Sequence, residues 1–143
     1  VNKKELVKSA FNLDRPDRYS LYANDFKWTD SVGSPPLDKN SFFGGEEPLR
    51  LAVPDLSIVI DDIKEDGDYI VIASHFSGTF RKDLDLSPMG MGVIPATGKA
   101  FASPSQRDRV SFDGDKISEL HNLETGPDAG MAGFIKALGV DTG

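Results

Sequence analysis

The segment from residue 56 to residue 80, LSIVIDDIKEDGDYIVIASHFSGTF, constrains the fold of this chain more than any other. Its first part alternates Leu56, Ile58 and Ile60 with other residues, which is the two-residue period of a strand. The EDGD that follows contains an Asp-Gly pair typical of a tight hairpin turn. The second part, YIVIASHFSGTF, is long enough for another strand. We therefore expect two antiparallel strands joined by a tight turn.

Helical patterns precede this hairpin. Asn2 has Glu5 three residues later, which is the spacing of a capping box, and apolar residues then recur at helical spacing. A second helix is expected to begin near Asp14, because Pro16 suits a first helical turn. Glutamates at the start of GEEPLRLAV favour a third, short helix. The expected helices are residues 2–13, 14–24 and 45–53, with a short extended piece at residues 26–30.

Most of the chain after the hairpin favours strand. Residues 81–94 contain proline, glycines and two methionines and are expected to form a loop. Helices followed by consecutive antiparallel strands indicate an α+β fold, in which helices cover one face of a curved antiparallel sheet. Such a sheet encloses a cone with an apolar wall, the usual anatomy of a small-molecule pocket. The later elements are expected strands at residues 100–112 and 116–123 and a short final helix at residues 128–139.

Composition limits the partners and the cellular location that we expect for this chain. The chain has 143 residues, which fits one domain over residues 1–143, and no cysteine for disulfides or thiolate metal ligands. Its net charge of −7 repels phosphate backbones, so we expect no nucleic-acid partner. No apolar run approaches the ~20 residues of a membrane span, and the charged N-terminus is unlike a signal peptide. We therefore expect no membrane partner and a cytoplasmic location.

Short pieces along nearly the whole chain occur in an order that resembles a known family. They include YANDFKWTD, AVPDLSIVIDDI, PATGKAF and FDGDKISELHN. On these pieces the chain resembles the SnoaL-like polyketide cyclases, in the nuclear-transport-factor-2-like superfamily that also holds ketosteroid isomerase. The resemblance implies a cystatin-like α+β barrel, that is, a cone closed by the N-terminal helices. It also implies cofactor-free general acid–base catalysis on a small hydrophobic carbonyl compound, by cyclisation, isomerisation, or hydration and lyase chemistry.

The resemblance further implies an aspartate beyond the last strand that acts as the acid or base. Thr125 stands where that aspartate is expected, and the nearest acids are Glu124 and Asp128. Asp128 is therefore a candidate catalytic residue. The alternative is that Asp128 caps the final helix, because it follows a proline and precedes the helical segment.

His75 lies inside the second hairpin strand, so its role depends on which face of that strand lines the cone. It shares a face with Ala73 and Ser77, which are small, whereas the opposite face carries isoleucines and phenylalanines. We expect the smaller, more polar face to line the cavity, which makes His75 a candidate catalytic residue that exchanges a proton with a ligand. If that face is convex, His75 lies on the outer surface or in a dimer contact.

His121 is the second of the two histidines and falls in the last expected strand. Glu119 lies two residues away on the same face of that strand, near enough to orient an imidazole. We regard His121 as a candidate catalytic residue and Glu119 as a candidate ligand-binding residue. The alternative is that His121 is a hydrogen-bonded residue of the core or its rim.

Five further residues are candidate ligand contacts. Tyr22 falls in the second expected helix, where its hydroxyl either donates to a ligand carbonyl or is the wet tip of a core side chain. Trp28 is expected in the cone wall, and Asp30 either faces the cavity or hydrogen-bonds the loop that follows it. Met89 and Met91 are adaptable apolar contacts suited to a flap over the cavity mouth.

Three functions therefore stay open: a cofactor-free enzyme, a non-catalytic binding protein for small hydrophobic ligands, and a dimerisation module. Histidines that point into the cone near an acid would favour the enzyme, and a cone lined only by apolar groups would favour the binding protein. A cone filled by the chain's own side chains would favour the dimerisation module. No spacing typical of a metal site or a phosphate loop is present, so we expect neither metal nor cofactor.

We also expect a homodimer. Helices that close the cone cover only the concave face of the sheet, and the remaining face is expected to carry isoleucine and phenylalanine at alternate positions.

Overall fold

The computed structural model describes residues 2–87 and 92–126, so the expected final helix, Asp128, Met89 and Met91 lie outside the described residues. The helical elements are α1 (Lys3–Ala10), the 3₁₀ turn η1 (Arg18–Leu21) and α2 (Lys39–Ala52). The strands are β1 (Tyr22–Thr29), β2 (Leu37–Asp38), β3 (Ser57–Asp66), β4 (Tyr69–Thr79), β5 (Leu84–Asp85), β6 (Val93–Ile94), β7 (Ala100–Ala102), β8 (Gln106–Asp113) and β9 (Lys116–Asn122).

Most strands form one curved sheet in the order β2-β1-β9-β8-β4-β3, with β7 paired to the far end of β4. β3, β4, β8 and β9 follow one another as antiparallel neighbours, which confirms the predicted hairpin and the strand order after it. β1 runs parallel to β9. The sheet is therefore mixed, whereas the sequence predicted an antiparallel one. β5 and β6 form a separate antiparallel pair.

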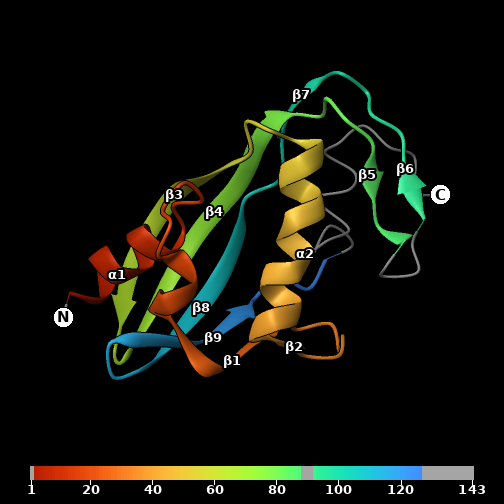
Figure 1. Ribbon diagram of the computed structural model, residues 1–143. Coiled ribbons are helices and arrows are strands. Elements are labelled where there is room, and N and C mark those ends of the chain that lie inside the picture. Colours follow the sequence, from red (N-terminus) through yellow and green to blue (C-terminus); the bar gives the residue numbers. More distant parts are fainter. Residues whose placement is uncertain (1, 88–91, 127–143) are drawn as a thin grey trace.

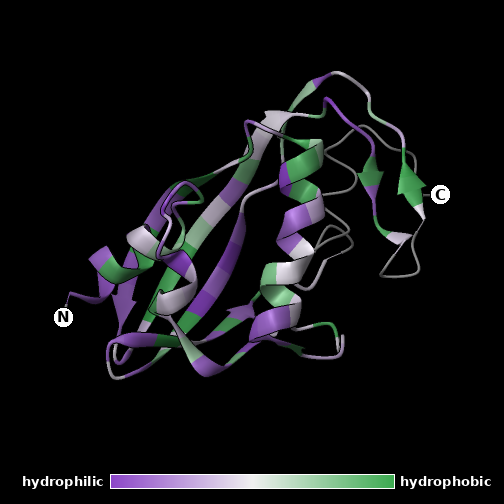
Figure 2. Ribbon diagram, viewed as in Figure 1, coloured by the Kyte–Doolittle hydropathy of each residue, from purple (hydrophilic) through white to green (hydrophobic). Residues whose placement is uncertain are grey.

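The helices lie on one face of this sheet, and the core lies between the two layers. Figure 1 shows α2 in front of β4 and β8, with α1 near the end of β3. Ile70 and Ile72 of β4, Val110 of β8 and Ile117 of β9 are fully buried in this core. Figure 2 shows hydrophobic and hydrophilic residues interspersed along α2 and the long strands, as expected for elements with one buried side. No helix in the described part of the chain is long and apolar enough to cross a membrane.

The prediction of a second helix at residues 14–24 is wrong except for one turn. Only Arg18–Leu21 is helical, and Tyr22 begins β1, which runs to Thr29 instead of forming the short predicted piece. The parallel neighbour β9 supplies backbone hydrogen-bond partners for this segment, and local propensity yields to that tertiary pairing. The third helix begins earlier than predicted, because the Asp38 side chain accepts a hydrogen bond from the Ser41 amide and caps its N-terminus.

The predicted strand at residues 100–112 is interrupted. It divides into β7 and β8 around Pro104, which has no N–H to donate to a strand ladder. Ser103 anchors the interruption to β4: its amide donates to the Phe76 carbonyl, and its hydroxyl accepts from the Phe76 amide at 2.8 Å.

The prediction of which face of β4 lines the cavity is also wrong. Ile70 and Ile72 are fully buried under the helices, and Ser74 and Phe76 continue that face to the cavity. The reason is geometric: the helices cover one face of the sheet, so core and cavity must share it. The uncovered outer face therefore does not carry these isoleucines, which was the premise of the predicted dimer contact.

Candidate functional site

A cavity of about 250 Å³ lies between the inner face of the sheet and the helical layer. Phe42 and Leu49 of α2 and the first residue of β1, Tyr22, border it on the helical side. The opposite side comes from β4, β8, β9 and the turn between β7 and β8. The sheet residues that border the cavity are Ser74, Phe76, Gln106, Asp108, Leu120 and Asn122.

Asp108 brings a carboxyl group into this cavity from the middle of the sheet. It pairs with Ile72 on β4 and with Asn122 on β9, and it shares the inner face with them. Its Oδ1 atom is buried and has no hydrogen-bond partner among the described residues. Burial raises the pKa of Asp108 from 3.8 to about 6; the Asn122 amide acts against this rise, and the charge of Glu124 adds to it. Such a carboxyl can accept or donate a proton near neutral pH.

The amide of Asn122 is held in place next to this acid. Its Nδ2 donates to Gln106 Oε1 at 2.7 Å, and its Oδ1 accepts from the Glu124 amide at 3.1 Å. Asn122 is only 3% exposed. These contacts fix the polar end of the cavity, which Asp108, Asn122 and Gln106 border.

Tyr22 and Trp28, two of the predicted ligand contacts, both border the cavity. Tyr22 is 2% exposed, and burial raises the pKa of its phenol, so the hydroxyl keeps its proton. That hydroxyl donates to the Ala10 carbonyl across a long 3.3 Å contact. Phe26 and Phe43 pack edge-on against the Tyr22 ring and hold it in place.

A buried ion pair closes one side of the cavity. Arg18 of η1 and Glu46 of α2 form two parallel contacts, Nη1 to Oε2 at 2.6 Å and Nη2 to Oε1 at 2.9 Å. Their side chains are only 6% and 14% exposed. The Arg18 guanidinium also lies over the Phe43 ring, 5.1 Å from its centroid. Fork-like pairing of this kind fixes η1 against α2.

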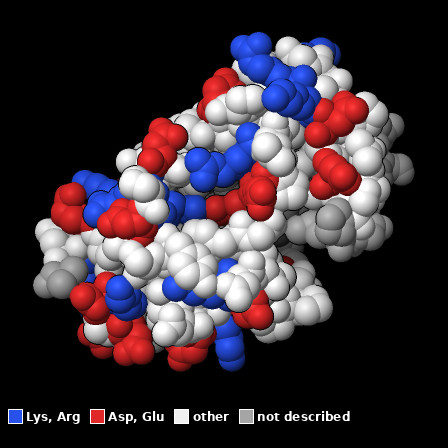
Figure 3. Space-filling view, viewed as in Figure 1, with Lys and Arg blue, Asp and Glu red and all other residues white. Residues whose placement is uncertain are grey.

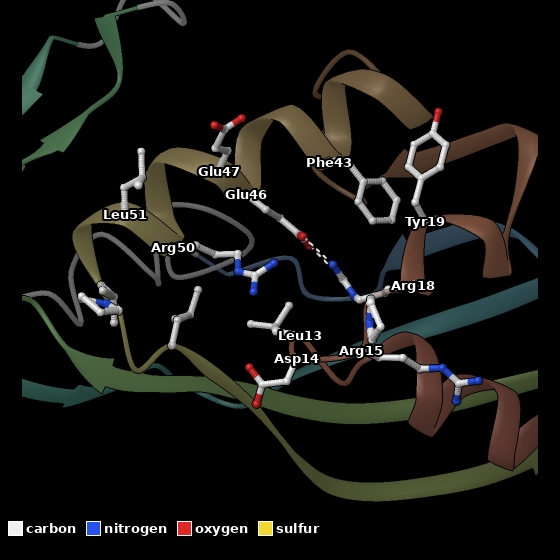
Figure 4. Close-up of a pocket in the computed structure, with 14 residues that line it drawn as sticks. Leu13, Asp14, Arg15, Arg18, Tyr19, Phe43, Glu46, Glu47, Arg50 and Leu51 are labelled. Atoms are coloured by element: carbon white, nitrogen blue, oxygen red, sulfur yellow. Dashed lines mark hydrogen bonds and ion pairs between the residues drawn. The ribbon is translucent and has the colours of Figure 1, made fainter.

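The same ion pair borders a second hollow, which we call the outer groove. This groove of about 690 Å³ lies between α2, η1 and the segment leading into β3. Figure 4 shows Arg18 and Glu46 pointing toward each other, with Arg50 and Asp14 extending into the groove. On the face of the molecule in Figure 3, Lys/Arg and Asp/Glu side chains are interspersed. The pair thus separates an open, charged groove from the enclosed cavity.

His75 lies beside the cavity in β4, between Ser74 and Phe76. The alternation of the strand and the pairing of His75 with the exposed Val59 place its side chain on the outer face. Its imidazole is engaged by Asp61 of β3, with Nδ1 2.8 Å from Oδ2. Ser105 donates to the same carboxylate oxygen at 2.8 Å. These two hydrogen bonds lower the pKa of Asp61, and the bond from His75 has the larger effect. The side chains of His75 and Asp61 are 22% and 34% exposed.

His121 and Glu119 lie together, but neither is among the residues that border the cavity. Thr29 connects them: its hydroxyl donates to Glu119 Oε2 at 2.6 Å and lies 2.7 Å from His121 Nδ1. The second ring nitrogen of His121 is 3.2 Å from the hydroxyl of Ser31. Because Leu120 and Asn122 point to the cavity, the alternation of β9 places His121 on the outer face.

Asp30 fixes the loop after β1. Its Oδ1 accepts hydrogen bonds from the backbone amides of Val32 and Ser34, at 3.2 and 3.0 Å. Hydrogen bonds in this loop lower the pKa of Asp30, and that with Ser34 has the largest effect. Asp30 is not among the residues that border the cavity. Within residues 2–87 and 92–126, no group of three or more acidic or histidine side chains could hold a metal ion.

No sequence pattern predicted Arg18, Glu46 or Asp108 as residues of the cavity. Asp108 stands in the polar run SQRDRVSF, which suggests an exposed strand. A signal was nevertheless present, since Asp108 and Val110 share a face by alternation, and Val110 is fully buried. Arg18 and Glu46 are 28 residues apart in the chain, and no local pattern connects them.

Comparisons with known proteins agree with this geometry. A family model described as SnoaL-like domain matches residues 5–120. No curated protein sequence matches the chain. AclR from Streptomyces galilaeus, a proposed hydroxylase, is similar in structure, with a TM-score of 0.71, 18% identity and coverage of 95% of this chain and 94% of that one. IdmH from Streptomyces antibioticus, a proposed polyketide cyclase, has a TM-score of 0.68, 20% identity and coverage of 98% of this chain and 100% of that one. At these identities the solved structures show a shared fold.

Proposed function

The chain belongs to the SnoaL-like domain family, and on that premise we propose that it catalyses proton transfer on a small hydrophobic carbonyl compound bound in the cavity. Asp108 is the proposed acid and base. The reaction is of the kind in which an enol or enolate forms, as in ring closure or isomerisation. Two solved structures of this fold are of proposed polyketide cyclases, which supports a carbonyl substrate.

The environment of Asp108 is the observation that carries this proposal. A carboxyl with a pKa of about 6 is a stronger base than an ordinary aspartate, yet it is mostly ionised at neutral pH. Its Oδ1 is buried and has no hydrogen-bond partner among the described residues. An unpaired buried acceptor of this kind costs stability, and such costs are typical of functional sites.

The cavity residues suit the two charge changes of enolisation. The Asp108 carboxylate takes a proton from the carbon next to the carbonyl group, and the electron pair of that C–H bond forms the enolate. The phenol of Tyr22 keeps its proton, and its O–H, turned from the long contact with the Ala10 carbonyl, donates a hydrogen bond to the oxygen that becomes negative. Asp108 then returns the proton to a different atom in an isomerisation. In a ring closure, the enolate carbon attacks a second carbonyl carbon of the same molecule, and the alkoxide that forms takes the proton that Asp108 holds.

The size of the cavity supports a small ligand. A volume of about 250 Å³ is slightly below the usual range for drug-sized ligands, roughly 300–1,000 Å³, so one or two rings fit. Phe42, Trp28 and Leu120 supply apolar walls, and the polar end at Asp108 orients the carbonyl group. The roles of His75, His121 and Asp128 as further acid–base groups stay predictions.

Hydrogen–deuterium exchange tests the proposal without knowledge of the natural substrate. Small aryl ketones such as acetophenone and 2-tetralone are incubated with protein in deuterated buffer, and proton NMR follows exchange next to the carbonyl. We expect catalysed exchange, reduced about 10²–10⁴-fold in Asp108→Asn, which is nearly isosteric but cannot act as the base. Asp113→Asn, an exposed acid at the end of the same strand, is the matched control.

Fluorescence of Trp28, the only tryptophan, reports ligand binding in the same samples. Binding without catalysed exchange in the unaltered protein would refute the catalytic proposal and leave the cavity as a binding site. Exchange that survives in Asp108→Asn would show that another group is the base.

A further inference from the structure

Asn122 lies directly opposite Asp108 in the sheet. β8 and β9 pair the two residues, and both border the cavity. The Leu123 amide donates to the Arg107 carbonyl at 2.9 Å, so the backbone hydrogen bonds of this strand pair lie at the neighbouring residues. Asp108 and Asn122 therefore form a pair without backbone hydrogen bonds between them. In antiparallel sheets such pairs bring side chains closest, with Cβ atoms about 4.5–5.5 Å apart.

The orientation of the Asn122 amide follows from its other partners. The backbone N–H of Glu124 meets one terminal atom of the Asn122 side chain at 3.1 Å, and this atom must be the oxygen, because an N–H can only donate. The nitrogen, Nδ2, is then the atom that donates to Gln106 Oε1 at 2.7 Å. Nδ2 carries two hydrogens. Gln106 takes one of them, which leaves the other for the carboxyl group across the strand pair.

A donor at this place has a defined effect on Asp108. Burial raises the pKa of Asp108 to about 6, the Asn122 side chain lowers it, and the charge of Glu124 raises it. A hydrogen bond to the ionised form of a carboxyl group favours that form. The Asn122 amide therefore opposes burial, which alone would keep the carboxyl group protonated over more of the neutral pH range.

We infer that Asn122 is the positioning residue of Asp108: through the second hydrogen of Nδ2 it fixes the orientation of the carboxylate and keeps it ionised near neutral pH. Asn122 acts on the reaction through Asp108 and needs no contact with the ligand. Gln106 and the Glu124 backbone in turn hold Asn122. The inference rests on the proposed function, which it deepens by naming the residue that orients the base.

Glu124 connects this pair to the protein surface. Its Oε1 accepts from the backbone amide of Arg107 at 3.1 Å and from Arg107 Nε at 2.9 Å. The Arg107 side chain is 60% exposed. Glu124 thus holds Asn122 through its backbone while Arg107 binds its charge.

The other ionisable groups around Asp108 are already engaged or keep their protons. Tyr22 at the helical side of the cavity keeps its proton, because burial raises the pKa of its phenol. Arg18 and Glu46, which also border the cavity, pair with each other. On β4, Asp108 faces the uncharged Ile72. The state of Asp108 is therefore expected to respond chiefly to burial, to Asn122 and to Glu124.

Nitrogen-15 NMR of the Asn122 side-chain amide tests the contact in the unaltered protein. The Nδ2 signals are assigned through their bonds to the Asn122 Cβ, and the two proton shifts are followed across the titration of Asp108. We expect one of the two protons to shift with a midpoint near pH 6, and to lose this shift in Asp108→Asn. Nδ2 protons that both ignore the ionisation of Asp108 would overturn the inference.

Asn122→Leu removes the amide at nearly constant size, and Asn24→Leu makes the same exchange at an exposed position of β1. We expect the Asp108 midpoint, measured by carbon-13 NMR, to rise from about 6 to about 7 or above in Asn122→Leu and to stay unchanged in Asn24→Leu. A merely structural role of Asn122 predicts the opposite sign, because a loosened site admits water and the midpoint falls toward the ordinary value of 3.8. An unchanged or lower midpoint would overturn the inference. If Asn122→Leu does not fold, the Nδ2 titration of the unaltered protein decides.

The exchange assay separates this inference from the proposed function. In Asn122→Leu the inflection of the exchange rate against pH should rise with the Asp108 midpoint. Above that inflection the rate should still be about 10-fold lower or more, because the carboxylate has lost its fixed orientation. If Asp108→Asn abolishes exchange while Asn122→Leu leaves its rate and pH profile unchanged, the inference fails and the proposed function stands. If the unaltered protein catalyses no exchange, both fail.

Discussion

Replacement of Asp108 by asparagine should make the protein more stable at neutral pH while it removes the proposed base. The acid has a higher pKa in the folded chain, about 6, than its ordinary value of 3.8. A raised acid pKa means that the folded state binds the proton more tightly than the unfolded state does. The resulting penalty is absent below pH 3.8, grows as the pH rises toward 6 and is complete above it. Asparagine carries no charge and avoids this penalty.

The magnitude follows from the size of the shift. About two pKa units correspond to about 3 kcal/mol at 1.36 kcal/mol per unit. This is an upper value, because Asp108 as a whole residue is only half-buried and water in the cavity screens its charge. With a urea dependence of about 2 kcal/mol per molar for a domain of this size, the midpoint should rise by about 1–1.5 M.

Urea unfolding followed by Trp28 fluorescence measures this effect at about pH 8 and about pH 4. The gain of Asp108→Asn over the unaltered protein should be large at pH 8 and almost absent at pH 4. Other aspartates with lowered pKa values affect both proteins equally, so the difference isolates Asp108. Asp113→Asn should show no such pH-dependent gain. Equal stabilities at pH 8, or a gain that is the same at both pH values, would refute the argument that burial of the carboxylate is costly.

Three further expectations concern the stability of the fold around the site and the oligomeric state. Glu46→Leu leaves the buried Arg18 without its partner and should cost about 3–5 kcal/mol in urea unfolding; a loss below 1 kcal/mol would show that the pair is dispensable. Gly78→Ala places a methyl group in steric clash with Val53 Cγ1 and should cost about 1–3 kcal/mol, whereas Gly44→Ala, with open space around it, should be neutral or stabilising. We still expect a homodimer, because no helix in the described part of the chain covers the outer face of the sheet and Val59 and Tyr69 are exposed; light scattering at micromolar concentration that finds only a 15.5 kDa species would contradict this.

Local patterns predicted those parts of the fold that local forces decide. The alternation around Ile58 and Ile60 and the turn before Tyr69 produced the β3–β4 hairpin, and Asn2 caps α1 as its spacing with Glu5 predicts. Tyr22 was misassigned to a helix because its strand pairs with β9, which comes nearly 100 residues later. Such distant pairing leaves no local trace.

The site was harder to predict than the fold. The cavity side of β4 depends on where the helices lie, which the alternation of a single strand cannot tell. Asp108 and Asn122 meet across two strands, and Arg18 meets Glu46 across two helical elements, so each pair exists only in three dimensions. Asp61 holds the His75 ring on the outer face of β4, and this contact depends on a β-bulge between Ile60 and Asp62 that no local pattern predicts.

Carbon-13 NMR of the Asp108 carboxyl group tests most directly whether this cavity holds a proton-transfer group. The chain is labelled in aspartate, the Asp108 signal is assigned by its loss in Asp108→Asn, and its shift is followed from about pH 3 to about pH 8. We expect a midpoint near pH 6 in the free protein, and a change of this midpoint when acetophenone occupies the cavity. A midpoint near 3.8 that acetophenone leaves unchanged would contradict the assignment of Asp108 as the acid and base.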